Sequence, residues 1–291
     1  MPTPRTEIPR IDAHHHLWRY TPAEYAWIDD SMAPLQRDFL PTDLRKALRS
    51  ANITAAVAVQ ARQSLEETSF LLECAATTPE ICAVVGWAPL AADDLSTTLD
   101  HFSNRKKLVG YREIVQSEPD GYLDQPNFNR GIAQLTARGY TYDILIHQHQ
   151  LEEATRIADR HPQQRFILDH AAKPPIAASE LEPWATNIRA LAARPNVSCK
   201  ISGLVTEATW SNWSLDTLRP YLDICVEAFG AQRLLAGSDW PVCLVASTYP
   251  RWWSTLEHYF AAFTAHEQQR IFGLSAINIY RIPPSLSGAS L

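Results

Sequence analysis

The sequence lacks several patterns that would place it in a membrane, secreted or nucleic-acid-binding class. No apolar run approaches the roughly 20 residues needed to span a bilayer, and residues 1–10 contain no apolar stretch typical of a signal peptide. The five cysteines are odd in number and form no C-x-x-C pair, which is typical of a reduced, cytoplasmic protein with buried thiols. The net charge of -6 argues against nucleic acid or an anionic membrane surface as a partner.

Two familiar functional motifs are also missing. No G-x-G-x-x-G follows the first apolar run, which weakens a dinucleotide-binding alternative. No G-x-S-x-G occurs, although Gly237-Ser238-Asp239 looks superficially similar, so a serine nucleophile is disfavoured. Cys199 and Cys243 have no identifiable base and are interpreted as core residues.

What is present is a regular alternation of short apolar runs and helical patterns over 291 residues. Strands that alternate with helices predict a parallel sheet with right-handed crossovers. Eight such units fit a (β/α)8 barrel, or TIM barrel, better than an open doubly wound sheet. We therefore expect one α/β barrel domain over residues 1–291. The expected strands are residues 11–16, 55–60, 81–87, 108–113, 142–147, 165–170, 196–201 and 233–239.

Several helices carry recognisable ends. A capping-box pattern at Ser64 opens a helix towards Thr78. Gly139 sits where a glycine commonly follows a helix, after residues 126–138. Further helices are expected over residues 151–160, 180–194 and 214–229, and residues 283–291 are expected to be a frayed tail.

The segment from Trp18 to Leu40 is unusually long and rich in aromatic residues. It starts at the C-terminal end of the first strand, the face on which barrel active sites lie. Loops of this length are either functional or disordered, and its aromatic content argues against disorder. We interpret it as a wall or lid over the active site. Together with residues 117–125 and 210–214, it is expected to determine specificity.

Titratable and polar side chains close most of the expected strands. A strand places alternate side chains on one face, so His14 and His16 point together and His15 points away. Because the C-terminal strand ends of a barrel meet on one face, these residues are expected to surround one pocket. They are His14, His16, Gln60, Trp87, Arg112, Glu113, His147, Asp169, His170, Lys200, Ser202, Ser238 and Asp239.

This set of residues is compatible with two kinds of chemistry. His14, His16, either His147 or His170, and Asp239 can hold one Zn²⁺ or Mn²⁺ ion with an open position for water. Without a metal, Asp239 can act as a general base on water while the imidazoles, Arg112 and Lys200 polarise a carbonyl oxygen. Both alternatives describe attack of water on a carbonyl carbon.

The ordered motifs resemble the amidohydrolase superfamily, and more narrowly its amidohydrolase-2 branch, which contains sugar-acid lactonases. The resemblance covers nearly the whole chain. It is carried by Asp12-Ala13-His14-His15-His16-Leu17-Trp18, Tyr25-Ala26-Trp27-Ile28, Val85-Gly86-Trp87, Val109-Gly110-Tyr111-Arg112, Leu168-Asp169-His170, Lys173-Pro174, Lys200-Ile201-Ser202-Gly203-Leu204, Gly237-Ser238-Asp239-Trp240-Pro241 and residues 276–280.

The resemblance implies a distorted (β/α)8 barrel in which Asp239 accepts a proton from the hydrolytic water. It implies that His14, His16, His170 and Asp239 form the metal site, although some lactonases of this branch work without a metal. The sequence departs from the family pattern at Arg112-Glu113, where a bridging lysine is absent, so a binuclear centre is not expected. A second departure is Ala172, which stands where the family pattern has glycine.

We therefore expect a cytoplasmic hydrolase that opens a sugar-derived γ- or δ-lactone. The catalytic residues are expected to be Asp239, His170, Arg112 and Lys200. Substrate contacts are expected from Trp18, Trp27, Gln60, Trp87, His147 and Trp240, although core packing is an equal alternative for any one tryptophan. The rival functions are a metal-dependent decarboxylase of the same branch, a hydrolase of non-sugar acidic lactones of the pyrone or muconolactone type, and a non-catalytic binding barrel. The partner is a small molecule, and homo-oligomerisation stays open.

Overall fold

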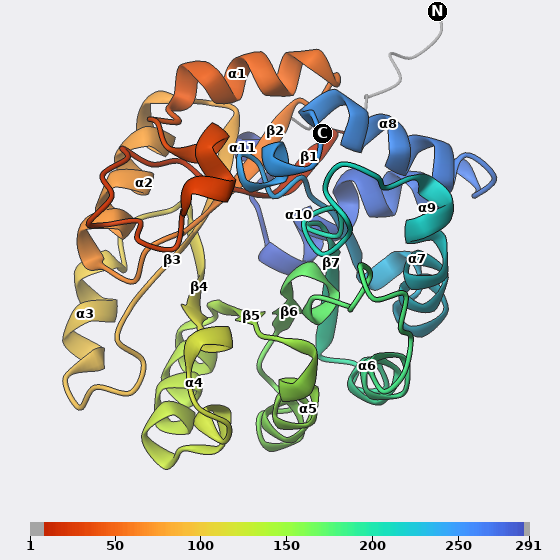
Figure 1. Ribbon diagram of the computed structural model, residues 1–291. Coiled ribbons are helices and arrows are strands. Elements are labelled where there is room, and N and C mark those ends of the chain that lie inside the picture. The colour runs from red at the N-terminus through yellow and green to blue at the C-terminus, as the bar shows by residue number, and fades with distance from the viewer. Residues whose placement is uncertain (1–8, 288–291) are drawn as a thin grey trace, which may run out of the picture.

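The computed structural model describes residues 9–287 and shows eight parallel strands surrounded by helices (Figure 1). The strands pair in chain order, so the predicted (β/α)8 barrel is confirmed. They are β1 (Ile11–His15), β2 (Ala55–Val59), β3 (Ile81–Gly86), β4 (Leu108–Ile114), β5 (Thr141–Leu145), β6 (Phe166–Leu168), β7 (Val197–Ile201) and β8 (Leu234–Ala236).

The barrel closes between the end of β1 and the segment that follows β8. His15 and Trp240 form a parallel bridge, the His16 N–H donates to the Trp240 carbonyl at 2.6 Å, and the Asp239 N–H donates to the His14 carbonyl at 2.8 Å. The Asp12 carboxylate reinforces this seam because it accepts hydrogen bonds from the Ser238 N–H and hydroxyl, at 2.8 and 2.6 Å. The closure between β1 and β8 therefore depends on a few hydrogen bonds at the C-terminal ends of the two strands.

Helices follow the strands around the outside of the barrel. The Ser64 side chain caps α2 by accepting from the Glu67 N–H, and Gly139 ends α4 in the left-handed region at a φ of 79°. The helices are α1 (Pro41–Ser50), α2 (Leu65–Thr77), α3 (Leu95–Phe102), α4 (Pro126–Arg138), α5 (Leu151–Arg160), α6 (Trp184–Ala192), α7 (Leu215–Phe229), α8 (Tyr249–Phe260), α9 (Ala265–Gln269), α10 (Ser275–Tyr280) and α11 (Pro284–Ser287).

Two expectations about helix positions need correction. Helix α6 begins at Trp184 rather than at residue 180. The reason is Pro183, which lacks an N–H and disfavours the helical conformation in the residue before it. In the expected tail, Pro284–Ser287 form the short helix α11, while residues 288–291, like residues 1–8 of the expected N-terminal region, lie outside the described residues.

The strands separate two apolar layers. In β2, Val57 and Val59 pack inside the barrel, whereas Ala56 and Ala58 pack against the surrounding helices. This alternation is the period-2 arrangement of a strand. The interior layer also contains Tyr280 from α10. Apolar side chains thus fill one part of the barrel interior, and polar side chains gather at the C-terminal strand ends.

Residues 18–40 fold over the C-terminal end of β1. Trp18 and Phe39 pair as an antiparallel bridge, with reciprocal backbone hydrogen bonds of 3.0 and 2.9 Å. Between them lies a 3-10 helix, Asp30–Leu35, and its Met32 lines the central cavity together with Trp27. Trp18 itself is fully buried beneath this segment. Within residues 9–287, no helix is long and apolar enough to cross a membrane.

Candidate active site

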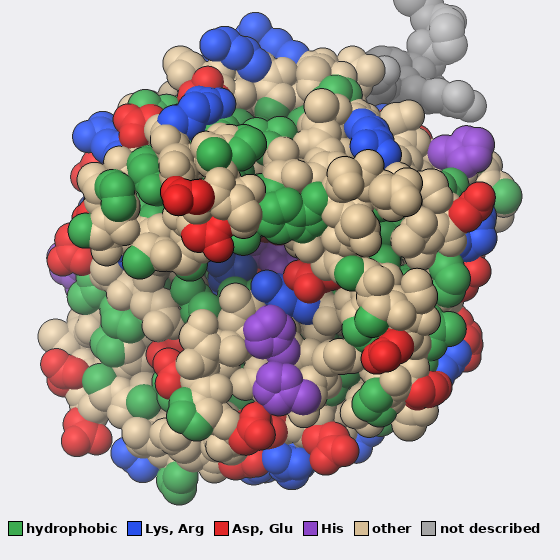
Figure 2. Space-filling model, in the orientation of Figure 1, with side chains coloured by type: hydrophobic (Ala, Val, Ile, Leu, Met, Phe, Trp, Pro, Cys, Tyr) green, Lys and Arg blue, Asp and Glu red, His purple; other side chains and the backbone are tan. Residues whose placement is uncertain are grey.

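Polar side chains from several strands meet at one cavity of about 390 Å³. The face shown in Figure 2 is hollowed near its centre, and side chains of both charges and histidine gather in and around the hollow. The lining combines polar groups with apolar walls. It consists of His16, Trp27, Met32, Ala61, Arg112, Ile114, Gln116, Ser117, Leu145, His170, Lys173, Thr206, Glu207, Trp210, Asp239, Val242 and Val245.

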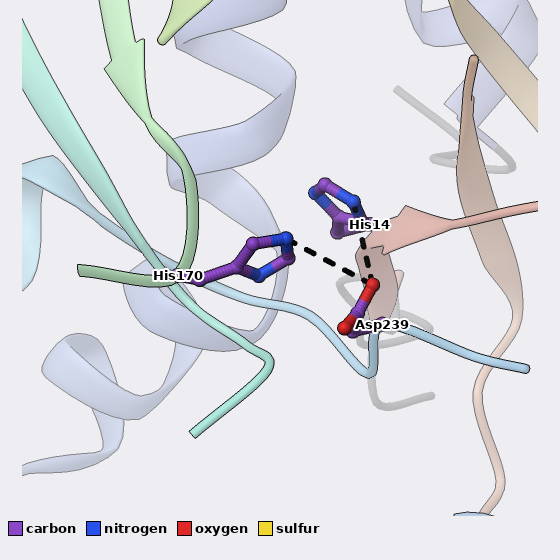
Figure 3. A group of neighbouring side chains, drawn as sticks. All are labelled: His14, His170 and Asp239. Atoms are coloured by element: carbon purple, nitrogen blue, oxygen red, sulfur yellow. Dashed lines mark ion pairs between the residues drawn. The ribbon is translucent and has the colours of Figure 1, made fainter. Parts of the chain in front are cut away.

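Asp239 is the centre of a histidine cluster at the inner end of this cavity. Its Oδ1 lies 3.3 Å from His16 Nε2, 3.7 Å from His14 Nε2 and 3.9 Å from His170 Nε2. Figure 3 shows His14, His170 and Asp239 pointing toward one another from three separate segments of the chain. These three residues can each offer one ligand atom within 4.8 Å of the others.

The hydrogen bonds around the histidines are compatible with a metal ion. His16 Nδ1 lies 2.7 Å from the Val59 carbonyl, which only accepts, so Nδ1 carries the proton and Nε2 presents a lone pair. That lone pair faces His14 Nε2 at 3.2 Å and the Asp239 carboxylate. Acceptors that converge in this way fit a divalent cation of the zinc or manganese type. We therefore consider the donor set suitable for the ion that the sequence predicts.

Unusual backbone conformations aim two of these side chains into the cavity. Residues 170–173 all have positive φ values, between 49° and 58°, and Asp239 has a φ of 58°. Non-glycine residues seldom adopt this region, and such residues gather at functional sites. Gly203 makes room for the turn, because a Cβ there would lie 2.6 Å from His170 Nδ1. The ring of His170 is oriented by Ser202, whose hydroxyl lies 2.9 Å from Nδ1.

A fully buried ionic network supports the cluster from below. Lys200 Nζ lies 2.5 Å from Asp143 and 2.8 Å from Asp169, and it also contacts His14 Nδ1 at 3.1 Å. Arg112 donates to Asp169 Oδ2 at 2.9 Å. Charged groups that are buried in this way are tolerated because each is paired. The network fixes the positions of His14 and Arg112 relative to each other.

The surroundings set the protonation states of the acidic and basic groups. Burial alone would raise the pKa of Asp239, but the neighbouring His170, His16 and Lys173 outweigh it and lower that pKa below its ordinary value. Burial lowers the pKa of His170 to about 4. At neutral pH, Asp239 is thus an ionised carboxylate beside a neutral His170 imidazole, which is the state that a proton acceptor requires.

The predicted site residues divide into three groups by position. His16, Trp27, Arg112, His170 and Asp239 line the cavity. His14 lies behind this lining and contacts His16, and Lys200 lies behind His14 and contacts it. In the described part of the chain, the other predicted substrate contacts lie outside the lining, and their contact with substrate stays a prediction. These residues are Trp18, Gln60, Trp87, His147 and Trp240.

Two of the outlying residues have clear structural contacts. Gln60 is fully buried and donates to the Arg112 carbonyl at 3.1 Å. His147 is half-buried and stacks on His149 with ring centroids 5.9 Å apart. His15 is fully buried and lies outside the lining, and the direction of its side chain stays a prediction. Burial lowers the pKa of His15 to about 3, so its ring is neutral.

Sequence reasoning assigned no individual site role to several polar or aromatic residues of the lining. Gln116 and Ser117 follow β4, and Lys173, Thr206, Glu207 and Trp210 lie in the segments after β6 and β7. Lys173 stands in the Lys173-Pro174 motif, and Trp210 begins one of the loops expected to determine specificity. Glu207 carried no signal beyond its position after a C-terminal strand end.

The fold and this arrangement of histidines and aspartate define an amidohydrolase-type barrel. The amidohydrolase family model matches residues 11–282, and the chain belongs to this family. The chain is 40% identical over 286 residues to an L-fucono-1,5-lactonase of Burkholderia multivorans, covering 94% of this chain and 96% of the relative. It is 35% identical over 278 residues to an L-fucono-1,5-lactonase of Burkholderia ambifaria, with the same two shares covered.

A solved structure supports the same relationship. An amidohydrolase from Burkholderia multivorans with bound zinc superimposes with a TM-score of 0.92. It is 40% identical in sequence, and the match covers 94% of this chain and 100% of that chain. The family predicted from the sequence is thereby confirmed.

Proposed function

We propose that this amidohydrolase opens the ring of a neutral sugar lactone, such as an aldono-1,4- or 1,5-lactone, by adding water to its carbonyl carbon. The observation that carries the proposal is the ionised Asp239 carboxylate within 3.3 to 3.9 Å of three imidazoles, at the inner end of a cavity of about 390 Å³. The names of the two Burkholderia relatives support the same substrate class.

The chain's own residues can carry out each proton transfer of the reaction. Asp239 accepts a proton from water as the water oxygen bonds to the lactone carbonyl carbon. Arg112 and His170 face the cavity and are placed to stabilise the negative charge that develops on the carbonyl oxygen. The ring C–O bond then breaks, and protonated Asp239 returns its proton to the leaving alkoxide. The product is an open hydroxy acid.

A divalent cation would be held by His14, His16, His170 and Asp239. When bound, such an ion supplies Lewis-acid polarisation of the carbonyl oxygen. Lys200 is expected to act on the reaction through its contact with His14, since it is fully buried behind the cavity lining. We therefore assign Lys200 a positioning role.

The charges around the cavity favour a neutral substrate over the acidic substrates of the rival functions. Arg112 is already paired with Asp169 at 2.9 Å, and Lys173 lies 3.8 Å from Glu207. Among the lining residues that the structure describes, no cation is left without an acidic neighbour to bind a substrate carboxylate. A benzoate decarboxylase or a dicarboxylate pyrone hydrolase would need such a cation.

The proposal is tested by a hydrolysis screen over aldono-1,4- and 1,5-lactones with a pH indicator, together with an assay for carbon dioxide release. Proton release without carbon dioxide is the expected result. Asp239→Asn should lower kcat by about 100- to 10,000-fold because the variant lacks a general base. Ligand binding by this variant should be largely retained. Unchanged turnover in Asp239→Asn, or release of carbon dioxide, would refute the mechanism.

A further inference from the structure

Lys173 and Glu207 form a polar pair in the more exposed part of the cavity. Their side chains are 20% and 25% exposed, whereas the side chain of Asp239 is only 6% exposed. Lys173 Nζ lies 3.8 Å from Glu207 Oε1. This distance is about 1 Å longer than a charge-assisted hydrogen bond between such groups. The pair is therefore close enough for mutual attraction and loose enough to admit polar groups of a ligand.

Glu207 and Asp239 are two acidic side chains that act on each other in one cavity, so a further anion from the substrate would be costly there. Burial raises the pKa of Glu207 and the nearby Asp239 raises it further, while Lys173 opposes both effects. The walls beside the pair are mainly apolar or aromatic, with Trp210, Val242 and Val245 in the same cavity. The Glu207 carboxylate can only accept hydrogen bonds, and the hydroxyl groups of a polyol substrate can donate them.

We propose that Glu207 is a specificity-determining residue that selects neutral, hydroxylated lactones and rejects lactones that carry a carboxylate. Its carboxylate accepts hydrogen bonds from substrate hydroxyl groups, and its attraction to Lys173 keeps that ammonium from binding a substrate anion. This inference rests on the proposed lactone hydrolysis and adds to it the charge and the hydrogen-bonding groups of the substrate.

The test compares two lactones that share one ring and differ in terminal charge. Galactono-1,4-lactone ends in a neutral CH₂OH group, and galactaro-1,4-lactone ends in a carboxylate. For the unaltered protein, kcat/KM should favour the neutral lactone. Glu207→Gln should lower this preference about tenfold, because it weakens hydrogen bonding to the neutral lactone and frees Lys173 for the anion. The change should appear mainly in KM, since Glu207 takes part in none of the proposed proton transfers.

A second variant tests the same idea in the opposite direction. Lys173→Met leaves the Glu207 charge unopposed and should increase the preference for the neutral lactone. This variant carries the test if Glu207→Gln fails to fold. The matched control is Asp93→Asn, whose side chain is 99% exposed outside the cavity and which should leave the preference unchanged.

The outcomes separate this inference from the proposed function. A preference that stays within twofold of the original in both variants, in a protein that hydrolyses the neutral lactone, overturns the role of Glu207 alone. An equal loss of kcat/KM for both lactones likewise overturns it, because that result indicates only a structural role. Failure of the unaltered protein to hydrolyse any aldonolactone would overturn the proposed function itself.

Discussion

Glu113 provides a sharp test of how burial and pH are linked in this barrel. It lies in β4 next to Arg112, is only 6% exposed, and lies outside the cavity lining. Burial, reinforced by the charge of Glu118 and opposed by Tyr122, raises the pKa of Glu113 from 4.5 to about 7. The folded state therefore binds more protons than the unfolded state between these two values. Below pH 4.5, Glu113 does not reduce the free energy of unfolding. As the pH rises from 4.5 through 7, the free energy of unfolding falls because of this group.

The magnitude follows from the two pKa values. The raised pKa of Glu113 lowers the free energy of unfolding by about 1 kcal/mol at pH 5 and by about 3 kcal/mol at pH 8. Glu113→Gln removes the titrating group but keeps its shape. Relative to the unaltered protein, the variant should thus gain about 2 to 3 kcal/mol in free energy of unfolding between pH 5 and pH 8. At about 2 °C per kcal/mol for a chain of this size, the difference in Tm should change by about 5 °C.

The assay is thermal unfolding of both proteins at pH 5 and pH 8, followed by circular dichroism. Other acids titrate in the same range, but they are common to both proteins and cancel in the difference. Lactone turnover should stay within twofold, because Glu113 does not line the cavity. A Tm difference that is the same at both pH values would refute the reasoning.

Three further variants test other features of the site. Ala172→Gly should leave the Tm nearly unchanged, because relief of the left-handed backbone strain offsets the loss of the buried methyl group. Ala154→Gly, inside α5, should lower the free energy of unfolding by about 1–2 kcal/mol. Comparable losses in both variants would contradict this reasoning. Tyr280→Phe removes a 2.6 Å hydrogen bond to buried Asp143 and should lower the free energy of unfolding by about 1–3 kcal/mol in urea titrations. After chelator treatment, calorimetric titration with zinc should show one binding site. The zinc affinity should fall at least about tenfold in His170→Ala. An unchanged affinity would show that His170 is not a zinc ligand.

Much of the fold was accessible from the sequence because its signals are local. The apolar strand runs, the Ser64 cap and the Gly139 stop are each determined by a few neighbouring residues, and they lie where the sequence predicts. The pairing of His14 with His16 was predicted from the alternation of side chains along a strand. Helix α6 was misplaced at its start because the helical pattern was extended through Pro183, against the restriction that proline imposes.

The cavity lining was less accessible because it depends on turns between elements. Gln60 illustrates the limit: it follows the last residue of β2, and its buried side chain donates to the Arg112 carbonyl instead of lining the cavity. Lys173 reaches the cavity through four successive residues with positive φ, a conformation that no residue pattern in this stretch predicts. Glu207 depends in turn on the course of the loop after β7. These positions follow from tertiary packing, which overrides local preference.

The seam between β1 and the segment after β8 joins the two parts of the active site, the imidazoles and the carboxylate. His14 and His16 lie on one side of it and Asp239 on the other, and the hydrogen bonds from Asp239 N to His14 O and from His16 N to Trp240 O hold the sides together. A molecule whose seam has opened can keep its helices and most of its sheet, yet it has no proton acceptor beside its imidazoles. Turnover is therefore an early reporter of local unfolding. In rising urea, activity should disappear while the helical circular dichroism signal is still intact.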